Sequence, residues 1–191
     1  MRKLQTQQKK YESVAYILDF KLNSESLTIK GKRGTIIQAI GGDYFMLLEL
    51  LGIPGVNYVI LEKLNISKER REKVLSVLGK LKYESLTSIA KNTLPQAVET
   101  IVIENEQKFV NFFNNAMPVT PRLNSLELIP GIGKTLMNVI LKEKEKKPFT
   151  SFKDIEERVG LKDPAKKITE RILEELKGNQ QIYLFVKQFK E

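Results

Sequence analysis

Residues 126–134 read Leu-Glu-Leu-Ile-Pro-Gly-Ile-Gly-Lys, and this stretch decides the fold of the C-terminal part of the chain. Two glycines on either side of one apolar residue let the backbone turn sharply, and they leave Ile132 as an anchor in the core. The turn leads into an amphipathic pattern, which predicts a helix over residues 134–147.

The start of this expected helix is a candidate phosphate site. The N–H groups of a first helical turn lack intrahelical partners, and the positive end of the helix dipole lies there. Lys134 adds a full positive charge. We expect Gly131, Ile132, Gly133, Lys134 and Thr135 to hold a backbone phosphate, a contact that is independent of nucleotide sequence.

This stretch resembles the helix-hairpin-helix family of nucleic-acid-binding modules, in which an apolar residue and Pro-Gly-Ile-Gly precede a second helix. The segment Pro-Phe-Thr-Ser-Phe-Lys-Asp-Ile at 148–155 is similar to the segment that joins two such units in double modules. The resemblance covers residues 123–176 and implies a second hairpin that opens at 159–161.

The second hairpin departs from the family pattern. Lys162 and Asp163 stand where the second hairpin glycine is expected, and the Asp163 carboxylate would repel a phosphate. The second hairpin then either has a structural role only, or the basic pair Lys166 and Lys167 compensates for the repulsion by Asp163. We count Lys162, Lys166 and Lys167 among the candidate nucleic-acid contacts.

The rest of this region is also expected to be mainly helical. A short helix is expected over 122–128, a second over 151–159 with Ser151 as its candidate cap, and a third over 164–176 with Pro164 at its first position and Gly178 as its stop. Residues 182–189 are expected to form a strand or a helix.

Short apolar and β-branched segments dominate residues 13–66. Strands are expected over 13–20, 27–30, 35–40, 43–51 and 56–61, with Gly-rich turns between them. Strands of this length and spacing predict a small OB-like β-barrel. Lys30, Lys32 and Arg33 occupy a turn between strands; they are candidate nucleic-acid contacts, with an ordinary solvated turn as the alternative.

Residues 67–118 are expected to connect two modules. The helical spacing of apolar residues after Ser67 predicts one helix through Leu78, and Thr93 to Gln96 reads as a capping box that starts a longer one. The fold class expected is α+β. It comprises a basic flexible tail over 1–12, an OB-like β-barrel over 13–66, connecting helices over 67–118 and an all-α double helix-hairpin-helix domain over 119–191.

The composition excludes several classes of function. The 191 residues contain no cysteine and no histidine, so a disulfide framework, a Cys/His zinc site and histidine-dependent nucleophilic catalysis are ruled out. No pair of Asp or Glu has a recognisable metal spacing, and we expect no enzyme, cofactor or metal. No apolar run is long enough for a membrane span, and the N-terminus lacks the apolar region of a secretory signal, so a cytoplasmic protein is expected.

The charge points to a polyanionic partner. Lys and Arg number 32 against 23 Asp and Glu, a formal net charge of +9. Residues 1–80 carry a net +6, residues 81–119 a net −1 and residues 120–191 a net +4. Basic ends around a neutral middle suggest two binding modules joined by a structural connector.

From about residue 11 to residue 186 the chain is similar to an uncharacterised archaeal family of proteins predicted to bind RNA. The stretches that carry the resemblance are Tyr-Glu-Ser-Leu-Thr at 83–87, Asn-Glu at 105–106, Phe-Phe-Asn-Asn-Ala at 112–116 and the hairpin at 130–134. The resemblance implies an OB-like barrel, a double helix-hairpin-helix and an archaeal origin. Members tend to be encoded beside genes for ribosomal proteins and a ribosomal-RNA dimethyltransferase, which implies a link to ribosomes.

Three hypotheses about function follow. The first is a non-catalytic RNA-binding protein that acts on ribosomal RNA or the ribosome. The second is a DNA-binding accessory or repair factor, because helix-hairpin-helix modules serve DNA more often than RNA. The third, ranked last, is a nuclease that uses carboxylates and magnesium.

Overall fold

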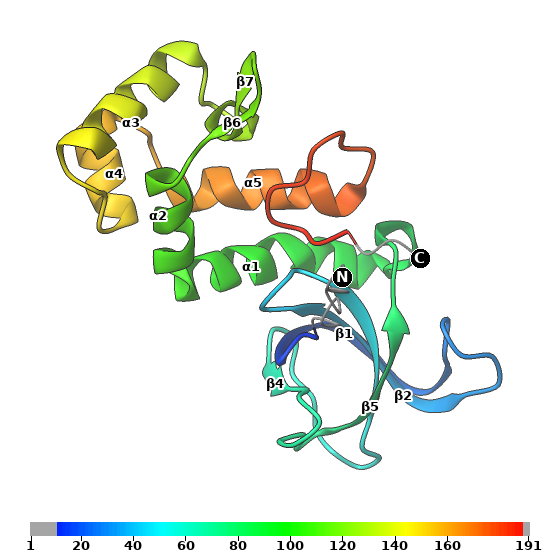
Figure 1. Ribbon diagram of the computed structural model, residues 1–191. Helices are drawn as coiled ribbons and strands as arrows, with labels where there is room; N and C mark the ends of the chain where they lie inside the picture. The colour runs from blue at the N-terminus through cyan, green and yellow to red at the C-terminus, as the bar shows by residue number, and fades with distance from the viewer. Residues whose placement is uncertain (1–10, 189–191) are drawn as a thin grey trace, which may run out of the picture. The chain divides into compact units, whose positions relative to one another are not determined.

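The computed structural model describes residues 11–188 (Figure 1). The chain forms two compact units, Met1–Leu81 and Lys82–Glu191, and each is described here by itself. The tail expected over residues 1–12 lies outside the described residues except for Tyr11 and Glu12. Glu12 is not part of a flexible tail, because its side chain is buried within the first unit.

The first unit is a single antiparallel sheet of five strands that curls into a half-barrel (Figure 1). Its strands lie in the order β4-β1-β2-β3-β5. The register shifts at two places along β1, as in a β-bulge, and such irregularities bend a strand and increase its twist. The strands are β1 (Val14–Glu25), β2 (Arg33–Gly41), β3 (Leu47–Gly52), β4 (Lys63–Asn65) and β5 (Val74–Lys80).

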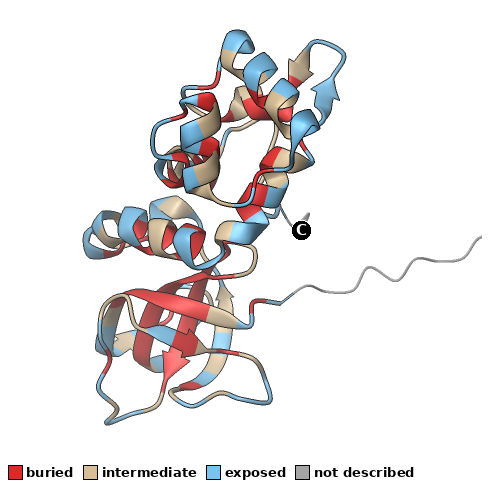
Figure 2. Ribbon diagram, turned by 90° about the vertical axis from the view of Figure 1, so that its left-hand side faces the viewer, coloured by how far each residue is buried: buried red, intermediate tan, exposed pale blue. Residues whose placement is uncertain are grey.

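The core of this unit lies along its central strands (Figure 2). Every residue of β3 and most of β2 are buried, which explains why both strands are mainly apolar rather than alternating between apolar and polar residues, with Gln38 and Glu49 as buried polar exceptions. Ile37 and Leu50 pair across the two strands and are fully buried. The prediction of a strand within 43–51 is confirmed, although β3 begins only at Leu47.

Three predicted elements of this region are wrong. Residues 27–30 and 56–61 form no strand. The helix predicted from Ser67 to Leu78 is replaced by β5, which pairs with β3 at Leu50 and Val77. The apolar spacing of this segment suits a helix, but pairing with a buried neighbour overrides a weak local preference.

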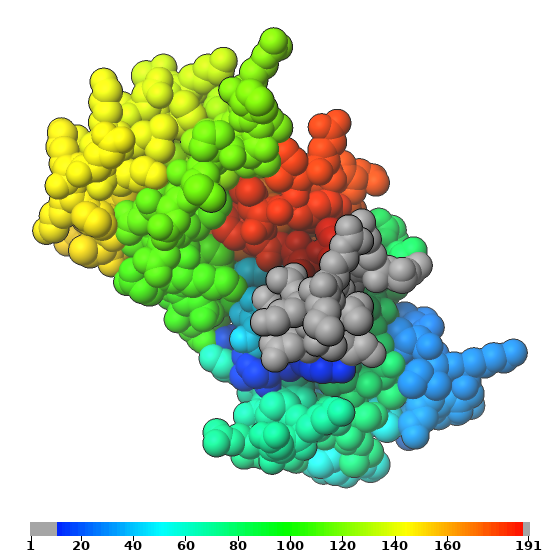
Figure 3. Space-filling view, in the orientation of Figure 1, coloured from blue at the N-terminus to red at the C-terminus, as the bar shows by residue number. Residues whose placement is uncertain are grey.

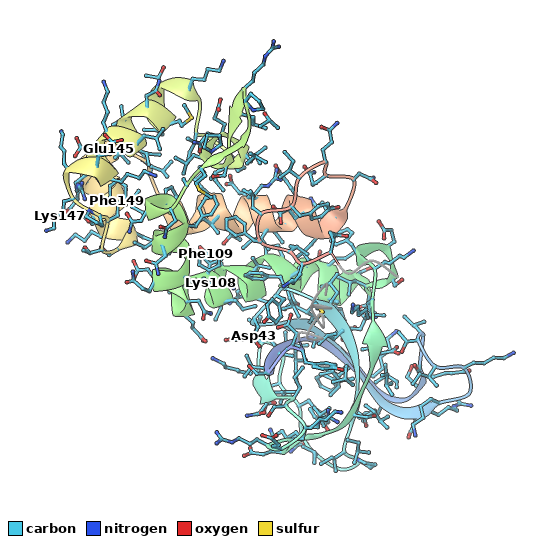
Figure 4. The ribbon with its side chains drawn as sticks, in the orientation of Figure 1. Asp43, Lys108, Phe109, Glu145, Lys147 and Phe149 are labelled. Carbon is cyan, nitrogen blue, oxygen red and sulfur yellow. The ribbon has the colours of Figure 1, made fainter. Side chains whose placement is uncertain are left out.

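Glu12 holds the turn between β2 and β3. Its carboxylate accepts hydrogen bonds from the backbone N–H groups of Asp43, Tyr44 and Met46, at 2.7, 3.0 and 2.9 Å. A Cβ on Gly41 would lie only 2.0 Å from the Glu12 side chain, so the carboxylate needs a glycine there. Asp43, labelled in Figure 4, in turn accepts a hydrogen bond from the Ser13 N–H at 2.6 Å.

The second unit is mainly helical and also contains a small β-ribbon. Its elements are η1 (Tyr83–Ser85), α1 (Ser88–Glu104), α2 (Glu106–Asn114), β6 (Pro118–Thr120), β7 (Leu123–Asn124), η2 (Ser125–Leu128), α3 (Lys134–Lys146), α4 (Phe152–Val159) and α5 (Pro164–Lys177). The helices predicted at 134–147, 151–159 and 164–176 are confirmed as α3, α4 and α5.

The helix start predicted at Thr93 is wrong. Helix α1 begins at Ser88, where the Thr87 side chain accepts a hydrogen bond from the Ala90 N–H, and Pro95 lies inside the helix. The long helix predicted to follow is divided at Asn105 into α1 and α2. The predicted helix over 122–128 is also only partly present, because η2 covers Ser125–Leu128 alone.

The helices of the second unit bury one face each. Helix α1 packs against α5, and α3 contacts α2, α4 and η2. Phe149, between α3 and α4 and labelled in Figure 4, is 2% exposed, and the Arg158 guanidinium lies 4.5 Å from its ring centroid. Arg158 also donates to the carbonyls of Glu143 and Lys147, which ties α4 to the end of α3.

Candidate nucleic-acid interface

The first hairpin is the turn between η2 and α3. Gly131 has a φ of +87°, in the left-handed region that favours glycine. Ile132 is 4% exposed, and its N–H donates to the Ile129 carbonyl at 3.0 Å. The sharp turn and the buried Ile132 agree with the sequence-based prediction for this stretch.

The N-terminus of α3 is open to solvent. Gly133 is the N-cap residue, with an extended backbone, and no side chain caps the helix. The first helical bond runs from the Met137 N–H to the Gly133 carbonyl, so the preceding amides are those that a helix start leaves without an intrahelical partner. Gly133, Lys134 and Thr135 are all exposed. This end of α3 therefore combines accessible N–H groups, the positive end of a helix dipole and a lysine.

The second hairpin, between α4 and α5, repeats the first with two changes. Gly160 has a φ of +73° and Leu161 is buried, as in the first hairpin. One additional residue, Lys162, then precedes the N-cap residue Asp163. The Asp163 carboxylate accepts a hydrogen bond from the Lys166 N–H at 3.0 Å, so α5 carries its own anion at its N-terminus.

Lys167 lies beside the first hairpin, although the sequence suggested a role for it in the second. A Cβ placed on Gly131 would lie 3.6 Å from the Lys167 Cε. The Lys167 ammonium forms an ion pair with Glu170 at 3.0 Å. The fold thus brings Lys167 together with Gly131, whereas the exposed Lys162 and Lys166 belong to the second hairpin.

A shallow pocket of about 470 Å³ borders the first hairpin. It is lined by the chain from Glu127 to Gly133 and by Glu174 of α5. The Glu127 carboxylate accepts a hydrogen bond from the Asn124 N–H, within a capping box at the start of η2. Because two carboxylates line the pocket, we expect an anion to approach the hairpin from the side of Lys134 instead.

The remaining candidate residues lie in the first unit. Lys30 and Lys32 are exposed in the loop between β1 and β2, and Arg33, the first residue of β2, is exposed beside them. The loop between β4 and β5 is also basic, and it exposes Lys68 and Arg70. The sequence-based prediction missed this second loop, because it assigned residues after Ser67 to a helix.

The described residues, 11–188, contain no group of three or more His, Cys, Asp or Glu side chains that could hold a metal ion. Within the same residues, no helix has both the length and the apolar character needed to cross a membrane.

Comparison with known proteins gives concordant results. Residues 11–187 match the family described as "Protein of unknown function (DUF655)". The chain is similar to an uncharacterised protein of Methanocaldococcus jannaschii, with 43% identity over 154 residues, which cover 80% of this chain and 70% of the relative. It is also similar to a crystal structure of a protein from Archaeoglobus fulgidus, described with the same family, with 37% identity and a TM-score of 0.81. That match covers 92% of this chain and 100% of the solved chain.

Proposed function

The chain belongs to the DUF655 family, and we propose that it is a non-catalytic protein that binds RNA through backbone phosphates. One observation carries the proposal. The N-terminus of α3 has no side-chain cap and lies beside Lys134, whereas the equivalent end of α5 is capped by Asp163. An uncapped, exposed helix start with an adjacent lysine favours a phosphate ligand.

The two hairpins support the reading of this region as a double helix-hairpin-helix. Each has a left-handed glycine followed by a buried aliphatic residue, Gly131 with Ile132 and Gly160 with Leu161. Each also leads directly into a helix, α3 or α5. We propose that only the first hairpin holds a phosphate, with Lys134 and Lys167 as its cations.

The sheet of the first unit supports an OB-like reading. OB folds are five-stranded, partly open barrels that bind oligonucleotides on one face and with the loops between strands 1 and 2 and between strands 4 and 5. In this chain both of those loops expose basic side chains, Lys30 and Lys32 in one and Lys68 and Arg70 in the other. We propose that they form a second RNA-contacting surface, and two such surfaces on one chain raise the overall affinity.

The test is equilibrium binding of the full chain to a labelled RNA at several salt concentrations. Lys134→Ala should weaken binding to RNA of any sequence by about three- to tenfold. It should also reduce the slope of the logarithm of the binding constant against the logarithm of the salt concentration by about one. Lys153→Ala, on the exposed face of α4, is the matched control, because it also removes one exposed lysine, whose ammonium lies 3.7 Å from the exposed Glu157 carboxylate. Equal losses in the two variants would contradict the proposed site, since net charge alone would then explain both.

Competition decides between RNA and the DNA-binding alternative. Structured RNA should displace the labelled RNA at lower concentration than duplex DNA of matched sequence. The partner that we propose is ribosomal RNA or the ribosome, and crosslinking in cells followed by sequencing should show enrichment of ribosomal RNA. Preferential recovery of DNA would instead support an accessory or repair factor.

A further inference from the structure

The loop between β1 and β2, residues 26–32, is fixed by hydrogen bonds to a buried carboxylate of the sheet. Glu49 on β3 has no exposed surface. It accepts hydrogen bonds from the Ser26 hydroxyl at 2.5 Å, the Leu27 N–H at 2.8 Å, and the Thr28 N–H and hydroxyl at 3.0 and 2.5 Å. One side chain therefore fixes three consecutive residues of the loop.

Other contacts fix the rest of the same loop. The Ser26 hydroxyl oxygen accepts a hydrogen bond from the Ile29 N–H at 2.9 Å, and the Ser26 N–H donates to the Lys32 carbonyl at 2.8 Å. A Cβ on Gly79 of β5 would lie 2.9 Å from the Thr28 Cβ, so a glycine lets the loop sit close to the sheet. The loop conformation is thus set before any ligand binds.

The outer surface of this loop is both apolar and cationic. Leu27 is 65% exposed and Ile29 is 43% exposed, and Lys30, Lys32 and Arg33 are exposed beside them. Residues 26–33 contain no acidic side chain, and the neighbouring Glu25 carboxylate at the end of β1 accepts a hydrogen bond from the Gly31 N–H at 3.4 Å. Figure 3 shows this segment, in medium blue, projecting from the sheet of its own unit.

We infer that the β1–β2 loop is a preformed surface for unpaired RNA nucleotides and that Glu49 is its positioning residue. Lys30, Lys32 and Arg33 can form ion pairs with phosphates. Leu27 and Ile29 can pack against the apolar faces of bases. Base faces are accessible in single strands and are covered by stacking in a duplex, so the apolar part discriminates between the two. This inference rests on the proposed function, and it adds to it the strand state of the RNA and the residue that organises the loop.

A rigid loop favours binding because less conformational entropy is lost when the ligand is held. A buried carboxylate that binds only backbone and hydroxyl groups of one loop serves that loop rather than the general core. Loss of the Glu49 contacts should therefore free the loop and leave the central strands β2 and β3 intact.

The first test separates the apolar surface from the charge. Leu27→Ser with Ile29→Ser keeps all three cations and every hydrogen bond to Glu49. It should weaken binding of the full chain to a single-stranded RNA by about five- to tenfold, with little change for an RNA hairpin of the same length. The matched control is Val59→Ser with Leu75→Ser, which removes two aliphatic side chains that are 64% and 52% exposed in the same unit.

The second test addresses Glu49. Glu49→Gln should weaken single-strand binding and accelerate hydrogen exchange at the Leu27 and Thr28 amides, while the amides of β2 and β3 stay protected. Glu62→Gln is the control, because it removes a carboxylate that pairs with Lys73 away from this loop. If Glu49→Gln does not fold, Ser26→Ala is the alternative variant, because it removes the hydroxyl that joins Glu49 to the Ile29 N–H. It should also accelerate hydrogen exchange at the amides of this loop and leave those of β2 and β3 protected.

The outcomes separate the inference from the proposed function. Unchanged single-strand affinity of the Leu27/Ile29 variant, or equal loss for hairpin and single strand, would overturn the inference while RNA binding stands. Faster exchange throughout the sheet in both Glu49→Gln and Ser26→Ala would overturn the positioning role. A wild-type protein that binds neither RNA would refute the proposed function itself.

Discussion

At the scale of single residues, carboxylates that bind backbone N–H groups organise this molecule. Asp163 caps α5, Glu12 holds the β2–β3 turn, and Glu49 holds the β1–β2 loop. Each of them satisfies amides that no helix or strand partner reaches, which a folded chain requires of its loops. Gly133 is the position where such an acceptor is missing, and this is why we assign the phosphate to α3.

Gly133→Asp should therefore raise stability and lower RNA affinity together. The backbone of Gly133 is extended, and a Cβ there meets nothing within 4 Å, so an aspartate can cap α3 without strain. The better cap and the less flexible unfolded chain should add about 0.5–1 kcal/mol, measured by urea unfolding. RNA affinity should fall at least tenfold, since the carboxylate occupies the phosphate position.

Gly133→Asn is the matched control. Asparagine caps a helix about as well as aspartate but carries no charge. It should give the same gain in stability with a smaller loss of affinity. An aspartate variant that binds RNA as tightly as the wild type would exclude the start of α3 as the site.

At the scale of elements, the second hairpin differs from the first by the additional residue Lys162 and by Asp163 as the N-cap residue in place of a glycine. Asp163→Asn should keep α5 capped, because asparagine also accepts the Lys166 N–H and tolerates the left-handed backbone found there, with a φ of +48°. Removal of the charge should leave the unfolding free energy within about 0.5 kcal/mol and strengthen RNA binding at low salt. Unchanged binding at low salt would mean that the second hairpin does not face the RNA.

The C-terminal segment depends on α5. Glu175 is 1% exposed and pairs with Arg171 at 3.0 Å, and its carboxylate accepts hydrogen bonds from three consecutive backbone N–H groups, those of residues 184–186. Phe185 then packs on Phe112, with ring centroids 5.0 Å apart. The strand or helix considered for residues 182–189 is absent over its described part, 182–188, because side chains rather than a ladder hold this segment.

Glu175→Gln should destabilise the protein by about 3–5 kcal/mol, because it removes the buried carboxylate that pairs most closely with the buried Arg171 charge. Chemical unfolding measures the loss, and hydrogen exchange should show faster exchange at residues 184–186. Glu174→Gln next to it removes a half-exposed carboxylate that lies 3.7 Å from Arg171, and it should cost less than about 0.5 kcal/mol. Similar losses in both variants would contradict the special role of Glu175.

At the scale of the whole molecule, two buried glutamates, Glu49 and Glu12, make contributions to folding stability that depend on pH in opposite directions. Burial raises the pKa of Glu49, but hydrogen bonds from Ser26, Thr28 and Leu27 outweigh it and leave the pKa below 4.5. Its contribution to stability is present above pH 4.5 and is lost as the pH falls through the lowered value. Burial raises the pKa of Glu12 above 4.5 against the backbone hydrogen bonds, so its contribution is lost as the pH rises through the raised value.

Unfolding free energies measured from acid to neutral pH test these signs. Relative to the wild type, Glu49→Gln should flatten the fall in stability below pH 4.5, and Glu12→Gln should flatten the fall above it. Parallel curves for all three proteins would show that neither carboxylate titrates differently in the folded and unfolded states.

The sequence by itself determined the parts of the fold that depend on local geometry. The pattern Pro-Gly-Ile-Gly fixed the first hairpin, and Ser151, Pro164 and Gly178 marked the limits of α4 and α5, because caps and turns act within a few residues. The first hairpin, together with the stretches at 83–87, 105–106 and 112–116, also carried the resemblance to the family. The RNA-binding role of the residues in the first hairpin stays a prediction.

Only the tertiary structure decided what depends on distant partners. It made residues 74–80 a strand, since β3 supplies their hydrogen bonds, and it made residues 27–30 a loop, since Glu49 takes their amides. It also placed the Lys167 side chain beside Gly131, a residue 36 positions earlier in the chain. No local pattern contains these pairings, because each arises from side chains that meet only after the chain has folded.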